Sequence, residues 1–235
     1  VGMHPVVIHG GGPQISDYLK KVGIESDFAD GMRITDPNSI HIVEMVLGGL
    51  VNKDLVKTIT SLGGKAVGLS GKDGGLIRAK KVIGKGEFKS IDFKNTGTVQ
   101  SIDPEVVKLL DGSSFIPIIA PIGIGDDGKT YNINADIVAG KIAHILEARK
   151  YMILTDTQGI LDADEKLIQS INAEGVRSLI SRGVISKGML PKVNSALEAV
   201  SSGVEHVQII NGTFDHSVLL ELFTDEGIGT MIRRK

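Results

Sequence analysis

Short apolar segments alternate with longer segments of helical periodicity along almost the whole of this 235-residue chain. The first of the apolar segments, Val6–Ile8, is apolar without alternation, which is typical of a strand buried on both faces. Strands that are separated by helices run mostly parallel, because the helix returns the chain to the same end of the sheet. The sequence therefore predicts an α/β fold in which helices cover both faces of a mainly parallel sheet.

The periodic segments also place the individual elements. Strands are expected at Val6–Ile8 and within 65–75, 114–134, 151–161, 206–212 and 229–234, with shorter antiparallel strands between Leu76 and Val99. Helices are expected from Pro13, from Asp36–Pro37 to Gly63–Gly64, from Asp103–Pro104, from about Ala135, and within 172–183, 188–203 and 215–223. We find no repeat, low-complexity segment or linker, and we expect one compact domain with two lobes.

Composition narrows the possible partners. The net charge is -2, from 26 basic and 28 acidic residues, so neither nucleic acid nor an anionic membrane surface is an obvious partner. No apolar run approaches the ~20 residues that a membrane-spanning helix needs. Cysteine is absent, which excludes disulfides and thiolate metal sites and fits a cytoplasmic protein.

Three consecutive glycines, Gly10–Gly12, stand between the first expected strand and the first expected helix. Glycines at such a position let backbone N–H groups approach an anion closely, and the helix dipole favours negative charge at that end. The alternative is a tight strand-to-helix turn without a ligand. The glycines alone leave both interpretations open.

A second glycine pattern has a different meaning. Residues 123–128 match the G-x-G-x-x-G spacing, but a strand-like segment follows them where a dinucleotide-binding fold requires a helix. Asp-Asp-Gly between two β-rich runs is typical of a hairpin turn. No G-x-x-x-x-G-K-[ST] motif is present. The sequence therefore predicts a hairpin here and argues against a nicotinamide oxidoreductase.

Polar residues in three further segments are candidates for ligand contacts. Arg33 in "DGMRITD" suits a carboxylate clamp, although a solvated surface arginine is the alternative. Asn132, Asn134 and Asp136 in "YNINAD" alternate along an extended segment, and capping of the next helix by Asn134 or Asp136 competes with a binding role. Lys192 lies in the first turns of a helix, where a cation opposes the dipole unless an anion is near.

Taken together, these motifs resemble the amino acid kinase family in order and spacing. The resemblance covers essentially all 235 residues and rests on "VVIHGGGPQI", "DGMRITD", "YNINAD", "LTDTQGIL" and "GMLPKV". It implies a three-layer αβα sandwich with a central, mainly parallel open sheet. It also implies that residues 1 to about 148 form the lobe for the amino-acid substrate, and that residues from about 149 to 235 form the nucleotide-binding lobe.

Within the family, the motifs are most similar to the branch that phosphorylates the side-chain carboxylate of N-acetyl-L-glutamate. The resemblance implies transfer of the γ-phosphoryl group of ATP, giving N-acetyl-L-glutamyl 5-phosphate in arginine biosynthesis, with Mg²⁺ held mainly by the nucleotide phosphates. Two alternatives remain. One is another amino acid kinase that acts on aspartate, glutamate or carbamate, and the other is a non-catalytic regulator that binds arginine.

The resemblance assigns roles to the substrate-binding residues one by one. Gly11 and Gly12 would offer backbone N–H groups to the reacting carboxylate and to the transferring phosphoryl group. Arg33 would bind the α-carboxylate, and Asn132 would help to hold the amino-acid substrate. A carboxylate is already a nucleophile at neutral pH, so no general base is required. We therefore interpret His9 as a packed or hydrogen-bonded residue.

The remaining implied residues concern phosphoryl transfer and the nucleotide. Lys192 would neutralise charge on the phosphoryl group and on the leaving ADP, and Asp136 would orient the catalytic lysines. The expected nucleotide-binding residues are Thr155, Asp156, Gly159, Leu161, Val184, Ile185 and Ser186.

Three further expectations follow from the resemblance. The final helix and strand resemble the form of the enzyme that arginine inhibits, which would place Glu221 and Gly227 at an arginine site. The family carries a Lys-x-Gly-Gly strand before the segment that opens this sequence at Val1, so we expect that strand to be missing here and the chain as written to be weakly active. A homo-oligomer is also implied, either a dimer or, where an N-terminal helix is present, a hexamer.

Overall fold

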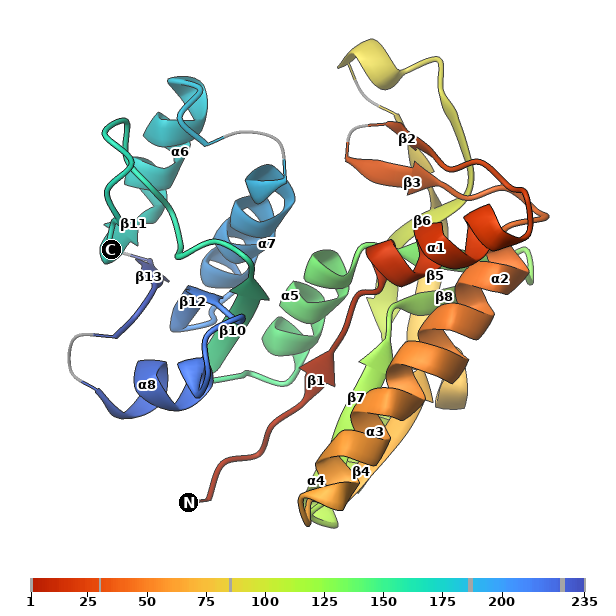
Figure 1. The fold of residues 1–235 in the computed structure, drawn as a ribbon, viewed down its shortest axis with the longest axis horizontal. Coiled ribbons are helices and arrows are strands. Elements are labelled where there is room, and N and C mark those ends of the chain that lie inside the picture. Colours follow the sequence, from red (N-terminus) through yellow and green to blue (C-terminus); the bar gives the residue numbers. More distant parts are fainter. Residues whose placement is uncertain (1, 30, 85, 186–187, 225–226, 235) are drawn as a thin grey trace. The chain divides into compact units, whose positions relative to one another are not determined.

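The computed structural model describes residues 2–29, 31–84, 86–185, 188–224 and 227–234 (Figure 1). The chain divides into two compact units, which we call unit 1 (residues 1–138) and unit 2 (residues 139–235). The boundary falls inside helix α5 (Ala135–Ile145), ten residues before the position near residue 148 that the sequence suggests.

Unit 1 is built on a parallel three-stranded sheet with the order β1-β7-β4. Its strands are β1 (Val7–Ile8), β4 (Ala66–Ser70) and β7 (Ile116–Ala120). Val7 and Ile8 are only half-buried, whereas the sequence predicts a strand buried on both faces; the difference arises because β1 is an edge strand of this sheet. The helices of the unit that precede α5 are α1 (Gly12–Lys21), α2 (Ile40–Glu44), α3 (Asn52–Ser61) and α4 (Glu105–Gly112).

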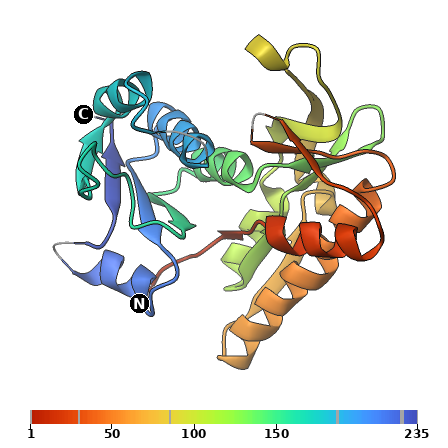
Figure 2. The same ribbon diagram turned by 45° about the horizontal axis from the view of Figure 1, so that its top comes forward.

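A π-helical segment, η1 (Met45–Val51), joins α2 to α3. The sequence predicts one helix here, and in Figures 1 and 2 the three segments do form one continuous rod, whose α3 part packs against β4 and β7. A buried apolar cluster holds α1 and this rod against the end of β7 and the start of the next strand; its members are Ile15, Leu19, Val43, Val46, Leu47, Ala120 and Ile122. The cluster therefore fixes the start of α1 relative to the carboxyl ends of the parallel strands.

The other strands of unit 1 form a closed barrel and a hairpin. The barrel consists of β5 (Ile77–Ile83), β6 (Asp92–Ile102), β8 (Ile122–Gly125) and β9 (Thr130–Ile133), and the hairpin of β2 (Asp27–Ala29) and β3 (Met32–Ile34). Short 3₁₀ turns lie at Asp73–Gly75 and Gly86–Phe88. The hairpin predicted at residues 123–128 is confirmed: β8 and β9 are antiparallel, and the N–H of Gly128 donates to the carbonyl of Gly125 at 2.9 Å.

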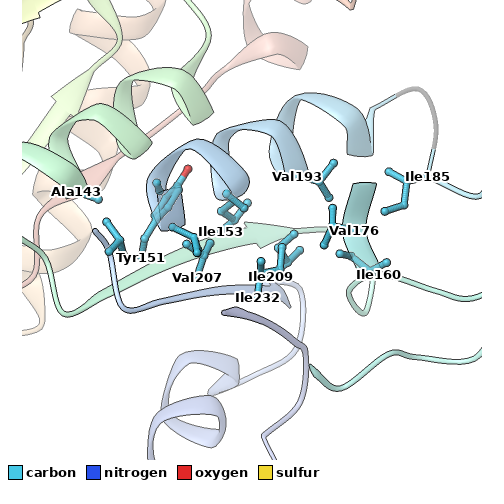
Figure 3. Close-up of a cluster of buried hydrophobic side chains, with 14 of the residues drawn as sticks. Ala143, Tyr151, Ile153, Ile160, Val176, Ile185, Val193, Val207, Ile209 and Ile232 are labelled. Carbon is cyan, nitrogen blue, oxygen red and sulfur yellow. The ribbon is translucent and has the colours of Figure 1, made fainter. Parts of the chain in front are cut away.

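Unit 2 contains a four-stranded mixed sheet with the order β10-β12-β13-β11. Its strands are β10 (Lys150–Thr155), β11 (Ser170–Asn172), β12 (His206–Asn211) and β13 (Thr230–Arg233), and its helices after α5 are α6 (Ala173–Ser181), α7 (Met189–Ser201) and α8 (Ser217–Phe223). β10 pairs in parallel with β12, and β11 with β13. Figure 3 shows the core of this unit, where Val193 of α7 lies above the sheet that carries Ile153 and Ile209.

The predicted α/β class is confirmed, because both units contain parallel strands together with helices that pack on them. Within the described residues, no helix is both long and apolar enough to cross a membrane. The same part of the chain contains no group of three His, Asp or Glu side chains that could hold a metal ion.

The barrel core offers a direct test of this packing. Phe93 of β6 is completely buried, so Phe93→Ala should lower the free energy of unfolding by about 3–5 kcal/mol through the cavity that it leaves. Leu109→Ala on α4, where the side chain is 68% exposed, should change it by less than about 0.5 kcal/mol. Urea unfolding followed by circular dichroism measures both variants, and equal losses would contradict the assigned packing.

Candidate active site

The three glycines connect β1 directly to α1. Gly11 is the N-cap residue, and a Cβ atom there would lie 2.8 Å from Cδ2 of Leu47 and 3.3 Å from Cγ2 of Val51, both in η1. A Cβ atom on Gly12 would meet no atom within 4 Å. Packing against η1 therefore explains Gly11, and Gly12 borders open space. The first N–H groups of a helix have no partners within that helix, so this turn can bind an anion.

Arg33 lies close to the same turn. It belongs to β3, is 7% exposed, and donates from Nη2 to the carbonyl of Gly12 at 3.1 Å and to Oγ of Ser16 at 2.8 Å, while Nη1 donates to Oγ of Ser26. Its guanidinium carbon is 4.7 Å from the centre of the Phe28 ring. Burial lowers the pKa of Arg33. None of the described Asp or Glu side chains forms an ion pair with it, so its charge is available for an anionic ligand.

Asn132 is joined to the Arg33 strand by two buried threonines. Its Nδ2 donates to Oγ1 of Thr35 at 3.1 Å, and the Thr35 N–H donates to Oγ1 of Thr96 at 3.0 Å. Thr96 in turn donates to the carbonyl of Arg33 at 2.5 Å. The structure therefore brings Arg33 and Asn132 into one network. Sequence reasoning missed Thr35 and Thr96, because their contact joins residues 61 positions apart.

The "YNINAD" segment contains the residue that caps helix α5. Oδ1 of Asn134 accepts the N–H groups of Asp136 at 2.8 Å and Ile137 at 3.3 Å, so Asn134 caps α5, as one of the two interpretations predicts. Asp136 itself lies in the first turn of α5 and is half-buried. A carboxylate at that position is favoured by the helix dipole.

In unit 2, Thr155 and Asn211 are the paired last residues of the parallel strands β10 and β12. The N–H of Gly212 donates to the Thr155 carbonyl at 2.8 Å, and Oδ1 of Asn211 accepts both the N–H and the hydroxyl of Thr213. Asp156 is exposed and accepts a hydrogen bond from the Thr155 hydroxyl at 3.2 Å. Ligands of open α/β sheets bind at the carboxyl ends of parallel strands, which is the position of these residues.

Gly159 and Leu161 lie in the segment after β10. Gly159 has φ 148°, and a Cβ atom there would lie 2.6 Å from Oγ1 of Thr230 and 2.8 Å from Cδ1 of Leu167. That threonine oxygen accepts the N–H of Ile160 at 2.8 Å, and Leu161 forms an isolated bridge with Leu167. Close packing against β13 is therefore enough to explain why residue 159 is a glycine.

The two described residues expected on the other side of the nucleotide, Val184 and Ile185, lie just after α6. The N–H groups of Val184 and Ile185 both donate to the carbonyl of Leu179. Ile185 is 4% exposed and its side chain belongs to the core of unit 2 (Figure 3), so this side chain does not line a ligand site. Ser186, also expected to bind nucleotide, lies outside the described residues.

Lys192 is the fourth residue of α7 and is half-buried. The first turn of α7 contains no acidic residue, so the cation stands at the helix end that disfavours it. Its neighbour Val193 belongs to the same buried cluster as Ile160 and Ile185 (Figure 3), which places this end of α7 near the loop that follows β10. The site thus combines a helix N-terminus with a lysine, which suits a phosphate group.

Two further titratable side chains, His9 and Glu221, are buried. His9 is 8% exposed, and burial lowers its pKa, which agrees with the interpretation of a neutral, hydrogen-bonded residue. Glu221 of α8 is also 8% exposed, and its Oε2 accepts the N–H groups of Ile228 at 2.7 Å and Gly229 at 3.2 Å. Gly227, with φ 62°, lies against the Glu221 carboxylate. No basic side chain among the described residues pairs with Glu221.

Comparison of the sequence with known proteins gives a consistent result. The sequence model of the amino acid kinase family matches residues 1–211. The acetylglutamate kinase of Alkalilimnicola ehrlichii is 52% identical over 241 residues, covering 100% of this chain and 79% of that protein. The acetylglutamate kinase of Nitrosococcus oceani is 54% identical over 245 residues, covering 100% of this chain and 81% of that protein.

Comparison of the structure extends the likeness to solved proteins. The smu.665 protein of Streptococcus mutans has a TM-score of 0.84 and 26% identity, covering 99% of this chain and 86% of that one. N-acetylglutamate synthase from Neisseria gonorrhoeae, complexed with coenzyme A and L-arginine, has a TM-score of 0.82 and 26% identity, covering 100% of this chain and 55% of that one. The chain therefore belongs to the amino acid kinase family and, within it, to the acetylglutamate kinases.

Proposed function

We propose that the protein transfers the γ-phosphoryl group of ATP to the side-chain carboxylate of N-acetyl-L-glutamate, a reaction of arginine biosynthesis. The observation that carries this proposal is the match to acetylglutamate kinases over the whole chain, at 52% and 54% sequence identity. The buried Arg33 beside the glycine turn supports it from the structure, because a guanidinium of this kind suits the α-carboxylate of an amino acid.

The reaction requires little covalent help from the protein. A side-chain carboxylate oxygen attacks the γ-phosphorus, the bond from that phosphorus to the β,γ-bridging oxygen breaks, and ADP leaves with the electron pair. The attacking carboxylate is ionised at neutral pH, so no proton has to be removed. The protein's work is alignment and the stabilisation of charge on the transferring group. That work needs N–H donors and cations rather than a general base.

The residues of unit 1 would hold the acetylated amino acid. Arg33 would bind the α-carboxylate, and Asn132, fixed by Thr35, would contact the rest of the substrate. The N–H groups of Gly11 and Gly12 would then face the side-chain carboxylate and the incoming phosphoryl group. Glycine N–H groups at a helix N-terminus suit this role because no side chain keeps the anion away.

The residues of unit 2 would hold ATP. Thr155 and Asp156 stand at the carboxyl ends of parallel strands, and Lys192 would supply positive charge to the phosphates. Mg²⁺ would reduce the negative charge of the nucleotide, and it would be bound mainly by the phosphates because the described residues offer no cluster of metal ligands.

Arginine would act as an inhibitor through Glu221. A buried carboxylate held by backbone N–H groups, with no basic partner among the described residues, suits the guanidinium or amino group of a small cation. The structurally similar N-acetylglutamate synthase was solved in complex with L-arginine, which supports an arginine site in this chain. We place the enzyme in the cytoplasm and expect it to form a homo-oligomer.

The activity is tested with ATP, Mg²⁺ and hydroxylamine, which converts an acyl phosphate to a hydroxamate. The full-length protein should give hydroxamate with N-acetyl-L-glutamate and none with glutamate or aspartate.

Lys192→Met should lower kcat of this reaction about 100- to 1,000-fold, because one donor to the transferring group is lost. Lys141→Met, which removes a lysine that pairs with Glu198 at the surface, should leave kcat unchanged. Equal rates for the two variants would contradict the role of Lys192.

The role of Arg33 is tested with a substrate whose α-carboxylate is an amide and whose side-chain carboxylate is intact. The wild-type protein should prefer the natural substrate by about 10- to 100-fold in kcat/KM, the value of a charged hydrogen bond. Arg33→Gln should reduce that preference to less than about threefold, since a neutral side chain gains little from the carboxylate. Arg78→Gln, at an exposed position of β5, should retain it. A preference that survives in Arg33→Gln would rule out this contact.

The arginine site is tested by isothermal titration calorimetry with L-arginine. Glu221→Gln keeps an acceptor for the Ile228 N–H but removes the charge, so arginine affinity should fall at least about tenfold. Glu198→Gln, at an exposed position of α7, serves as the matched control. Unchanged affinity in Glu221→Gln would place arginine elsewhere.

A further inference from the structure

A chain of hydrogen bonds leads from the start of α3 to the glycine turn. Nζ of Lys53 lies 3.2 Å from Oδ1 of Asn52, and Nδ2 of Asn52 lies 3.1 Å from Nε2 of His9. Nδ1 of His9 lies 2.9 Å from the carbonyl oxygen of Gly10. The relay therefore joins four residues, the last of which is the first glycine of the turn.

The direction of every bond in the relay follows from the chemistry of its ends. A lysine ammonium can only donate, so the Asn52 atom that faces Lys53 is the oxygen, and the amide nitrogen faces His9. A carbonyl can only accept, so Nδ1 of His9 carries the proton and donates to Gly10. Nε2 of His9 is then the acceptor for Asn52. His9 is thus the neutral Nδ1–H tautomer, which agrees with the lowered pKa that its burial causes.

Neighbouring groups hold the side-chain amide of Asn52, the central member of the relay, in place. Asn52 is 1% exposed, and the two N–H groups of its Nδ2 are shared among three acceptors, which are Nε2 of His9 and the carbonyls of Leu69 at 3.2 Å and Ile118 at 2.9 Å, in β4 and β7. A Cβ atom on Gly68 would lie 1.9 Å from Oδ1 of Asn52, so residue 68 leaves room for this side chain. The amide is therefore fixed to β7, which pairs with β1, and to β4 on the far side of β7, and His9 is fixed to the amide.

The bond to Gly10 controls the next N–H group along the chain. The carbonyl of Gly10 and the N–H of Gly11 belong to one planar peptide, and in a trans peptide they point in opposite directions. Holding the Gly10 oxygen therefore sets the direction of the Gly11 N–H. Three glycines in succession have wide conformational freedom, so an N–H group that must be aimed needs an external restraint.

We propose that His9 is a positioning residue that aims the Gly11 N–H at the reacting group through its hydrogen bond to the Gly10 carbonyl. The inference rests on the proposed function, in which that N–H stabilises the transferring phosphoryl group. A donor that is fixed beforehand stabilises the transition state more than the bound substrate. Loss of the restraint should therefore lower kcat and leave KM nearly unchanged.

Two amide variants separate this role from a structural one. The side-chain nitrogen of asparagine occupies the position of His Nδ1, so His9→Asn keeps a donor to Gly10 and loses the contact with Asn52. The side-chain oxygen of glutamine reaches the position of His Nε2, so His9→Gln keeps the contact with Asn52 and loses the donor to Gly10. Each variant removes one link of the relay, and urea unfolding checks that the two are equally stable.

The expected result is a difference between the two variants in kcat alone. His9→Gln should lower kcat of hydroxamate formation about 10- to 100-fold, less than the loss of a direct donor, while His9→Asn stays within about threefold of the wild type. KM for both substrates should change by less than about threefold in either variant. Equal losses of kcat in the two variants, or losses that follow the unfolding free energy, would overturn the proposal.

An independent readout does not need activity. In protein labelled with ¹⁵N-histidine, the nitrogen shifts and couplings of His9 near neutral pH should show a protonated Nδ1 and an unprotonated Nε2. The amide resonance of Gly11 should shift in His9→Gln and should not shift in His9→Asn. The opposite tautomer, or an unmoved Gly11 resonance, would overturn the proposal. If the wild-type protein forms no acyl phosphate while these signals are as expected, the proposed function fails and the restraint on the turn stands.

Discussion

The close approach of Gly11 to the π-helical segment η1 is the contact on which the arrangement of unit 1 depends. Because residue 11 has no side chain, Leu47 can lie against the backbone at the start of α1. That contact leaves the first turn of α1 at the carboxyl ends of the parallel strands, and the carbonyl of Gly12 in this turn accepts a hydrogen bond from Arg33. A buried guanidinium and a helix N-terminus are thus held together, which gives one region two separate means of attracting anionic groups.

Much of the fold could be predicted, because local chemistry determines it. Asp-Asp-Gly between β-rich runs gave the hairpin of β8 and β9, and Asn134 caps α5 as its position before the helix suggests. The π-helical segment could not be predicted, because residues 45–51 have the same apolar spacing that an α-helix would have. The Thr35–Thr96 contact could not be predicted either, since it depends on the tertiary path of the chain.

For the candidate site, the sequence and the structure contribute different things. The resemblance assigned glycines and apolar residues to ligand binding, yet packing against Thr230 explains Gly159, and the core of unit 2 contains the side chain of Ile185. Polar residues that hold the site residues in place without contacting a ligand, such as Asn52, do not belong to any recognisable sequence motif. Their function depends on which atoms face each other, and only the three-dimensional arrangement shows that a lysine fixes the orientation of this amide.

The central claim is that the side-chain carboxylate of N-acetyl-L-glutamate accepts a phosphoryl group from ATP. Phosphorus NMR of the full-length protein with ATP, Mg²⁺ and this substrate tests it most directly, because the acyl phosphate and ADP are observed as they form. The account predicts that an acyl phosphate resonance grows together with ADP, and only when N-acetyl-L-glutamate is present. Release of inorganic phosphate with no acyl phosphate signal, or the same signal with unacetylated glutamate, would contradict it.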